Sequence, residues 1–128
     1  MIYSHDYNAT YAPAMPVAEV TLENVETGMQ GEKLTAIVDS GADGCLLPVK
    51  CLEAMGSEPI RKARMVGVTG IVVQVEIHLL ILHLGPLTVY GVEAVADKQN
   101  GEAIIGRNVL NQLVVTLNGI AGVTEISD

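Results

Sequence analysis

The chain has 128 residues, of which 49% are hydrophobic but none is Trp or Phe, and its formal net charge is −8. This composition predicts one globular domain with an aliphatic core, and the acidic balance argues against a nucleic-acid partner, which would require clustered Lys and Arg. No secretory signal opens the chain and no apolar run reaches the roughly 18 residues of a membrane span, so we expect a soluble cytoplasmic protein without membrane contact.

The first sixteen residues are polar and end in a Pro-containing run, so we expect a flexible tail over 1–16 and a single domain over 17–128. The domain opens with the apolar–polar alternation of a strand. The elements expected next are a strand at 17–22, a turn at 26–31, a strand at 33–38, a short strand at 46–48 and one or two helical turns at 48–55.

The C-terminal half contains a hairpin whose four-residue tip, Gly67 to Gly70, has glycine at both ends. Residues 73–79 alternate cleanly, so one face of that strand should contact water. The remaining elements expected are strands at 87–96, 103–105, 114–117 and 121–126, a helix at 108–113, and turns at 85–86, 97–101 and 118–119. Many short strands with Gly-rich turns predict an all-β barrel or sandwich.

Metal and redox chemistry have little support in the sequence. Cys45 and Cys51 are six residues apart, which fits neither a CxxC pair nor a zinc ligand set. We expect both thiols to be free, as in a reducing compartment, with a disulfide between them as the minor alternative. His78 and His83 would face opposite sides of a strand. No metal and no cofactor are therefore expected.

Asp39-Ser40-Gly41 directly follows the apolar strand at 33–38. Alone, this triplet is typical of a turn in which Asp and Ser bond their own backbone and Gly takes positive φ. A second motif favours a functional site, because Ile104-Ile105-Gly106 runs two β-branched residues into a glycine before the expected helix. Glycine permits close backbone approach, which a strand packed beside the Asp39 loop would need.

Three segments in this order resemble the retropepsins, the single-domain, dimeric aspartic proteases of retroviruses and their cellular and bacterial relatives. The segments are Ile37 to Asp43, the Gly-flanked hairpin and Ile104 to Asn108, and the stretch from Ile104 to Asn118 is especially similar to lentiviral proteases. The resemblance covers about Val17 to Asn118. It implies a closed acid-protease barrel with one short helix near the C-terminus, active as a homodimer.

The resemblance also implies roles for single residues. Asp39 matches the catalytic aspartate, Ser40 the hydroxyl residue that bonds across the dimer, and Gly41 a residue whose carbonyl accepts a hydrogen bond from substrate. Asp43 matches a residue that meets substrate and pairs with an arginine, here Arg107. The other matched positions are Ala42 in the active loop, Gly67, Val68, Thr69 and Gly70 in the flap tip, and Ile105 and Gly106 in the motif that supports the loop.

The function implied is an aspartic endopeptidase, in which two Asp39 carboxylates of a homodimer share a proton and activate a water. The expected partners are a second copy of the chain and a peptide or protein substrate bound as an added strand. Two alternatives stay open: a non-catalytic retropepsin-like domain that dimerises or binds peptide, and a small-ligand-binding barrel.

The chain departs from the viral enzymes after Asn118, where it continues for about ten residues. The viral enzymes stop near that point and use their last strand in the dimer. Gly122 to Ile126 would therefore either replace that strand or block it.

Overall fold

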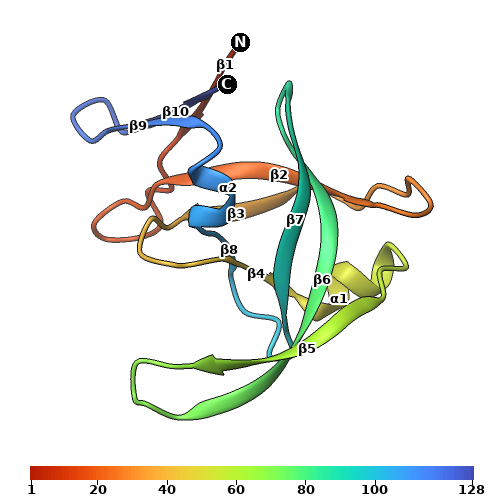
Figure 1. Ribbon diagram of the computed structural model, residues 1–128. Helices are drawn as coiled ribbons and strands as arrows, with labels where there is room; N and C mark the ends of the chain where they lie inside the picture. The colour runs from red at the N-terminus through yellow and green to blue at the C-terminus, as the bar shows by residue number, and fades with distance from the viewer.

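Six strands close into a barrel in the computed structural model, which describes residues 1–128 (Figure 1). The strands of the larger sheet are β2 (Val17–Asn24), β3 (Leu34–Val38), β4 (Cys45–Pro48), β5 (Pro59–Val66), β6 (Val72–Leu84), β7 (Leu87–Asp97) and β8 (Ala103–Ile105). The ring runs β2, β3, β8, β4, β7, β6 and back to β2, which pairs with β6 as well as β3. β5 pairs with β6 outside the ring. The predicted all-β barrel is therefore confirmed.

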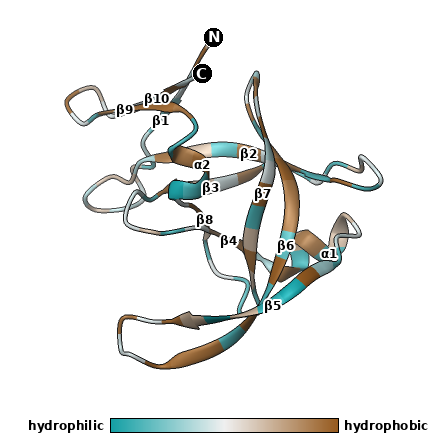
Figure 2. Ribbon diagram, viewed as in Figure 1, coloured by the Kyte–Doolittle hydropathy of each residue, from teal (hydrophilic) through white to brown (hydrophobic).

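Aliphatic side chains fill the barrel, as the absence of Trp and Phe requires. Alternate residues of each strand point inward, and Leu22 of β2, Leu82 of β6 and Ile105 of β8 are each at most 1% exposed. Figure 2 shows apolar residues along the barrel strands and also along the outer part of the β5–β6 hairpin. That hairpin leaves Val66, Val68 and Ile71 exposed, so its apolar side chains are not part of the core.

Two short helices accompany the barrel. α1 (Val49–Ala54) follows β4, buries Leu52 and ends before Gly56, whose φ of +71° suits a residue without a Cβ. α2 (Arg107–Leu110) follows β8 and is shorter than the predicted helix over 108–113. Neither helix has the length and apolar character needed to cross a bilayer.

A separate three-stranded sheet contains both ends of the chain, in the order β1 (Ile2–Asp6), β10 (Val123–Ser127), β9 (Val114–Asn118). The sequence predicted a tail without secondary structure at residues 1–16, so β1 is a difference from that expectation. Tyr3 explains its placement, because its hydroxyl accepts a hydrogen bond from the Glu19 N–H at 2.9 Å and its ring lies against Gly85. The division of the chain at residue 16 stays a prediction.

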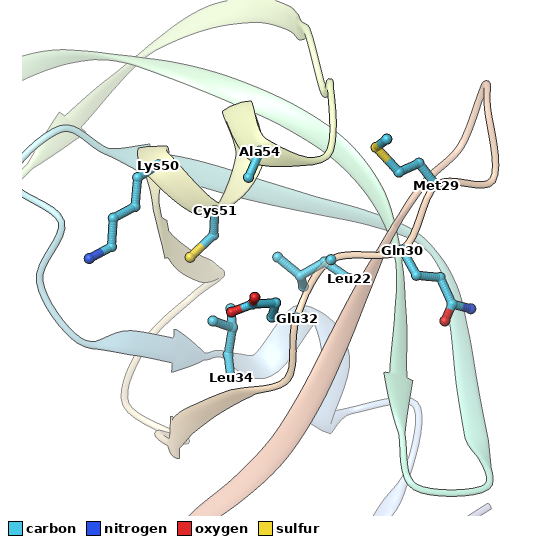
Figure 3. A pocket seen from close by; sticks show the side chains of 9 residues that line it. Leu22, Met29, Gln30, Glu32, Leu34, Lys50, Cys51 and Ala54 are labelled. Carbon is cyan, nitrogen blue, oxygen red and sulfur yellow. The ribbon is translucent and has the colours of Figure 1, made fainter.

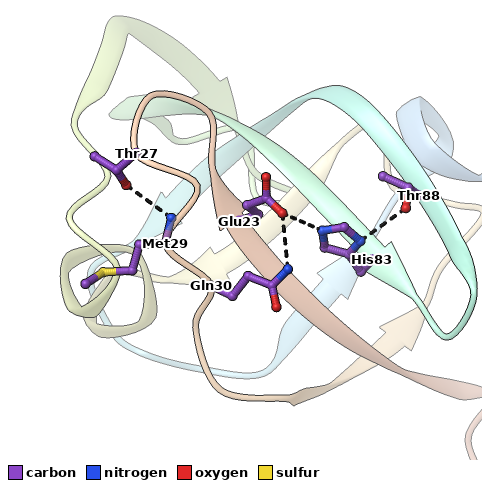
Figure 4. Close-up of polar contacts among 6 residues, drawn as sticks. All are labelled: Glu23, Thr27, Met29, Gln30, His83 and Thr88. Atoms are coloured by element: carbon purple, nitrogen blue, oxygen red, sulfur yellow. Dashed lines mark hydrogen bonds and ion pairs between the residues drawn. The ribbon is translucent and has the colours of Figure 1, made fainter.

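The two histidines of β6 lie in different surroundings. His83 is on the outer wall, where its Nε2 lies 2.9 Å from Glu23 Oε1 and its Nδ1 lies 3.1 Å from Thr88 Oγ1 (Figure 4). Hydrogen bonds from His83 and then from Gln30 lower the pKa of the Glu23 carboxyl. This cluster joins β2, β6 and β7. His78 is instead 4% exposed, and its Nδ1 lies 2.8 Å from Ser57 Oγ.

Burial of His78 makes the fold sensitive to acid. Desolvation lowers the pKa of His78 in the folded chain, so between that value and its ordinary pKa near 6.5 the unfolded chain binds more protons. The free energy of unfolding should therefore fall as pH is lowered from about 7 to 5, by about 1.4 kcal/mol per pKa unit of difference. We expect His78→Asn to reduce this slope in urea titrations at several pH values. Equal slopes for variant and wild type would contradict the assignment.

Candidate active site

The Asp39 loop leaves the barrel where β3 ends beside β8. These strands are parallel, and Val38 lies opposite Ile105. The N–H of the following residue, Asp39, donates to the Ile105 carbonyl at 3.0 Å. The loop then folds back on Asp39, whose Oδ1 accepts the Gly41 N–H at 2.9 Å and whose carbonyl accepts the Ala42 N–H at 3.2 Å. A half-buried carboxylate is thus fixed by the backbone of its own loop.

The segment after β8 holds the other side of this loop. The Arg107 N–H donates to the Ala42 carbonyl at 2.9 Å, and the Asn108 N–H donates to the Asp43 carbonyl at 3.2 Å. Gly106 makes this approach possible, because a Cβ there would lie 2.3 Å from the carbonyl oxygen of Gly44. The two motifs singled out in the sequence are therefore neighbours in space.

The Arg107 side chain joins two parts of the active loop. Its Nη1 donates to the Ser40 carbonyl at 2.8 Å, and its Nη2 forms an ion pair with Asp43 Oδ1. The Asp43 side chain is 96% exposed, so this ion pair contributes little to stability. Its effect is to fix the course of the active loop, since one planar guanidinium holds both ends of Ser40–Asp43.

We predict that Arg107→Lys disturbs the position of the active loop but leaves the stability of the fold almost unchanged. A single ammonium cannot reproduce the two-pronged contact with Ser40 and Asp43, so the peptide hydrolysis that the family resemblance implies should lose about tenfold or more in kcat/KM. The free energy of unfolding should change by less than about 1 kcal/mol, because the pair is exposed. Urea titration measures the free energy of unfolding of variant and wild type, and steady-state kinetics measures their kcat/KM. An unchanged kcat/KM would contradict the positioning role of Arg107.

Sequence reasoning missed a second set of contacts behind the loop. The Asn108 side chain accepts from the Cys45 thiol at 3.4 Å and donates to the Glu93 carbonyl at 2.8 Å. Glu93 in turn binds Arg61 of β5 through two hydrogen bonds of 2.7 Å, which lower the pKa of the Glu93 carboxyl. Burial raises the pKa of the Cys45 thiol. No local pattern marks these residues, because each lies on a different element.

A groove of about 400 Å³ lies between the active loop and the β5–β6 hairpin. Most of its lining is hydrophobic, and it comprises residues 41–46 of the loop and β4, residues 63–66 of β5, and Val75, Ile77, Val95 and Ile104. The predicted hairpin tip turns beyond it, where the Gly67 N–H donates to the Ile71 carbonyl at 3.1 Å. Val68 at this tip is fully exposed.

A second hollow, of about 610 Å³, lies beside α1 and shares no residue with the active loop (Figure 3). Figure 3 shows Lys50 and Cys51 of α1 facing Glu32 and Leu34 across it. Both cysteines of the chain are free. No three His, Cys, Asp or Glu side chains gather closely enough to hold a metal ion.

Solved structures share this fold at low sequence identity. A retropepsin-like aspartic protease from Rickettsia conorii matches with a TM-score of 0.64 and 8% identity, covering 98% of this chain and 91% of that one. The EIAV protease complexed with the inhibitor HBY-793 matches with a TM-score of 0.55 and 18% identity, covering 77% and 86%. The retroviral protease-like domain of Ddi1 from Leishmania major has a TM-score of 0.50 and 19% identity, covering 80% and 82%.

No curated protein matches the chain. The sequence profile described as gag-polyprotein putative aspartyl protease matches residues 14–112. This range includes the barrel, the Asp39 loop, the β5–β6 hairpin and α2. The chain therefore belongs to the gag-polyprotein putative aspartyl protease family and has the retropepsin-like fold.

Proposed function

We propose that this protein is an aspartic endopeptidase whose active site forms only in a homodimer. The observation that carries the proposal is the half-buried Asp39 carboxylate, held at the barrel edge by Gly41 and supported from behind by the strand and helix around Gly106. Family membership supports the same assignment. Each chain supplies one such aspartate, whereas general acid–base hydrolysis of an amide needs an acid and a base.

In the proposed dimer a two-fold axis brings the two Asp39 side chains within hydrogen-bonding distance. Two carboxylates at that separation do not both ionise readily, so one keeps its proton, as in the aspartic-protease dyad. The ionised Asp39 takes a proton from a water, which attacks the peptide carbonyl. The protonated Asp39 donates to the carbonyl oxygen, which gives a tetrahedral diol. The proton taken from the water then passes to the amide nitrogen as the C–N bond breaks, and a diol hydroxyl returns a proton to the Asp39 that had donated one. The apparent pKa values of such a dyad describe the two Asp39 carboxyl groups together and not either one alone.

The groove beside the loop supports an extended peptide as substrate. A peptide laid along the β5–β6 hairpin would gain backbone hydrogen bonds as an added strand, and its side chains would enter an aliphatic groove. In this proposal the hairpin with the tip Gly67, Val68, Thr69 and Gly70 is the flap. Its exposed apolar side chains would cover the peptide and exclude water.

Acidic pH should favour the proposed activity. The dyad must hold one proton, and each chain has a net charge of −8, which opposes association when the carboxylates are ionised. The cytoplasmic location expected from the sequence stays a prediction, supported by two free cysteines.

The proposal is tested by incubating the protein with a mixed peptide library from pH 4 to 7, with and without pepstatin, and identifying the products by mass spectrometry. We expect cleavage that increases toward acid pH and is abolished by pepstatin. The positions at which the peptides are cut would also define the side-chain preference of the enzyme. No cleavage by a protein shown to be dimeric would overturn the proposal and favour a non-catalytic dimerisation or peptide-binding domain.

A further inference from the structure

The hollow of about 610 Å³ beside α1 lies at the end of the barrel opposite the Asp39 loop. α1 follows the end of β4, and β4 runs antiparallel to β8, which is itself parallel to β3. The end of β4 and the start of β3 therefore lie at one end of the barrel, whereas Asp39 follows the end of β3. The mouths of β-barrels are among the places where proteins bind small molecules.

A β-bulge forms one wall of this hollow. Val20 of β2 lies opposite Leu34 of β3, and Glu23 of β2 lies opposite Gln30. Between these two pairs β2 has two residues, whereas the other side of the hairpin has three, residues 31–33. A strand bends at such an extra residue, and the hollow lies between this bend and α1 (Figure 3).

Hydrogen bonds hold both walls of the hollow in place without a ligand. On the helix side, the Lys50 N–H donates to Asn100 Oδ1 at 3.0 Å, and Leu52 of α1 is buried in the core. On the bulge side, the Gly31 N–H donates to the Leu22 carbonyl at 2.9 Å. The hollow is therefore preformed, and a ligand that enters it does not have to order its walls.

The apolar lining of the hollow is aliphatic. Its hydrophobic members are Leu22, Met29, Leu34, Cys51 and Ala54. Planar ligands gain from stacking on aromatic side chains, which this lining lacks, so it suits a flexible hydrocarbon chain. Met29 is 53% exposed at the edge of the hollow, and its unbranched thioether can adapt to the shape of such a chain.

One cation and one carboxylate lie on the rim of the hollow. Lys50 is the only cation among the lining residues, and Figure 3 shows it facing Glu32 across the hollow. The Lys50 ammonium takes no part in the ion pairs that lysine and arginine form in this chain, which belong to Arg61, Lys98 and Arg107. Lys50 is therefore free to pair with an anionic group of a ligand.

We propose that this hollow binds an aliphatic monocarboxylate, with the hydrocarbon chain on the apolar lining and the carboxylate at the Lys50 ammonium. Burial of the chain drives binding, and the unpaired cation selects the charged end. Glu32 on the opposite rim and the net charge of −8 disfavour ligands with more than one negative charge, such as a dicarboxylate or a phosphate.

Methionine methyl NMR locates the ligand, because two of the five methionines report on different sites. Met29 lines the hollow, and Met65 lines the groove beside the active loop. Titration with decanoate at pH 7 should shift the Met29 signal with a Kd on the order of 1 mM and leave the Met65 signal in place. Met29→Leu and Met65→Leu assign the two signals.

Two variants on the rim should have effects of opposite sign. Lys50→Gln should weaken decanoate binding about threefold or more, because it removes the only cation on the rim, and Glu32→Gln should strengthen binding about twofold, because it removes a repulsive charge. Decanol has the same chain without the charge, so its Kd should be the same for both variants and the wild type. Decanedioate should bind more weakly than decanoate. Circular dichroism verifies that both variants fold.

Three results would overturn the inference. The first is a Met29 signal that does not move up to about 10 mM decanoate, ten times the expected Kd. The second is a Met65 shift as large as that of Met29, which would indicate adventitious contact with apolar surface. The third is a decanoate Kd that Lys50→Gln leaves unchanged. None of these experiments needs peptide cleavage, so their outcome is independent of the proposed endopeptidase activity.

Discussion

Asp39→Asn is expected to lower peptide cleavage at least about 10³-fold, the scale of a lost general acid–base group. Asn has nearly the same shape and keeps an oxygen that can accept the Gly41 N–H, which lies 2.9 Å from Asp39 Oδ1. The variant should therefore fold and dimerise like the wild type. Asn cannot exchange a proton, however, so neither half of the proposed dyad could act as acid or base. Product formation from a peptide that the wild type cuts is the measurement.

Mixing the two chains tests whether one site uses two Asp39 residues. If each dimer needs both carboxylates, the activity of a randomised mixture follows the square of the wild-type fraction, so an equal mixture keeps about one quarter of the activity at constant total protein. The same dilution with an unrelated protein is the control for loss of activity by mass action. A linear dependence on the wild-type fraction, after full exchange of subunits, would contradict a shared site.

Local patterns predicted those parts of the fold that depend on neighbours in the sequence. The alternation over 73–79, the Gly67 to Gly70 tip and the Asp39 loop each leave a signal within a few residues, and the structure has β6, the hairpin and the loop at these places. The strand β1 left no such signal, because its partner β10 lies more than 100 residues away. The flexible tail expected there was therefore inferred only from the polarity of residues 1–16 and from the Pro-containing run that ends them.

The candidate site shows the same limit. The pairing of Arg107 with Asp43 was implied by family resemblance, and the structure places these side chains in contact. The contacts of Asn108 with Cys45 and Glu93 were not foreseen, since three different elements bring these residues together. Packing of the whole barrel brings such distant groups into one site. A short stretch of sequence carries no information about that packing.

Gly106→Ala is expected to destabilise the protein by about 3 kcal/mol, at the upper end of the range for overpacking. A Cβ at this position would lie 2.3, 2.6 and 2.8 Å from the oxygen, carbon and nitrogen of Gly44. These are backbone atoms, so no side-chain rotation can relieve the contact. Backbone strain at position 106 itself is not involved, because its φ of −101° and ψ of −172° are open to any residue.

Relief of this clash would require β8 and the active loop to separate, and the hydrogen bonds from Arg107 to Ala42 and from Asn108 to Asp43 cross that gap. We therefore expect Gly106→Ala to lose peptide cleavage as well as stability. Gly119→Ala is the matched control, since a Cβ there meets nothing within 4 Å, and it should change the free energy of unfolding by no more than about 0.5 kcal/mol. Urea titration of both variants and the wild type measures these changes in the free energy of unfolding. Equal stabilities would show that the loop can move away from β8 freely, and Gly106 could then not be what holds Asp39 in place.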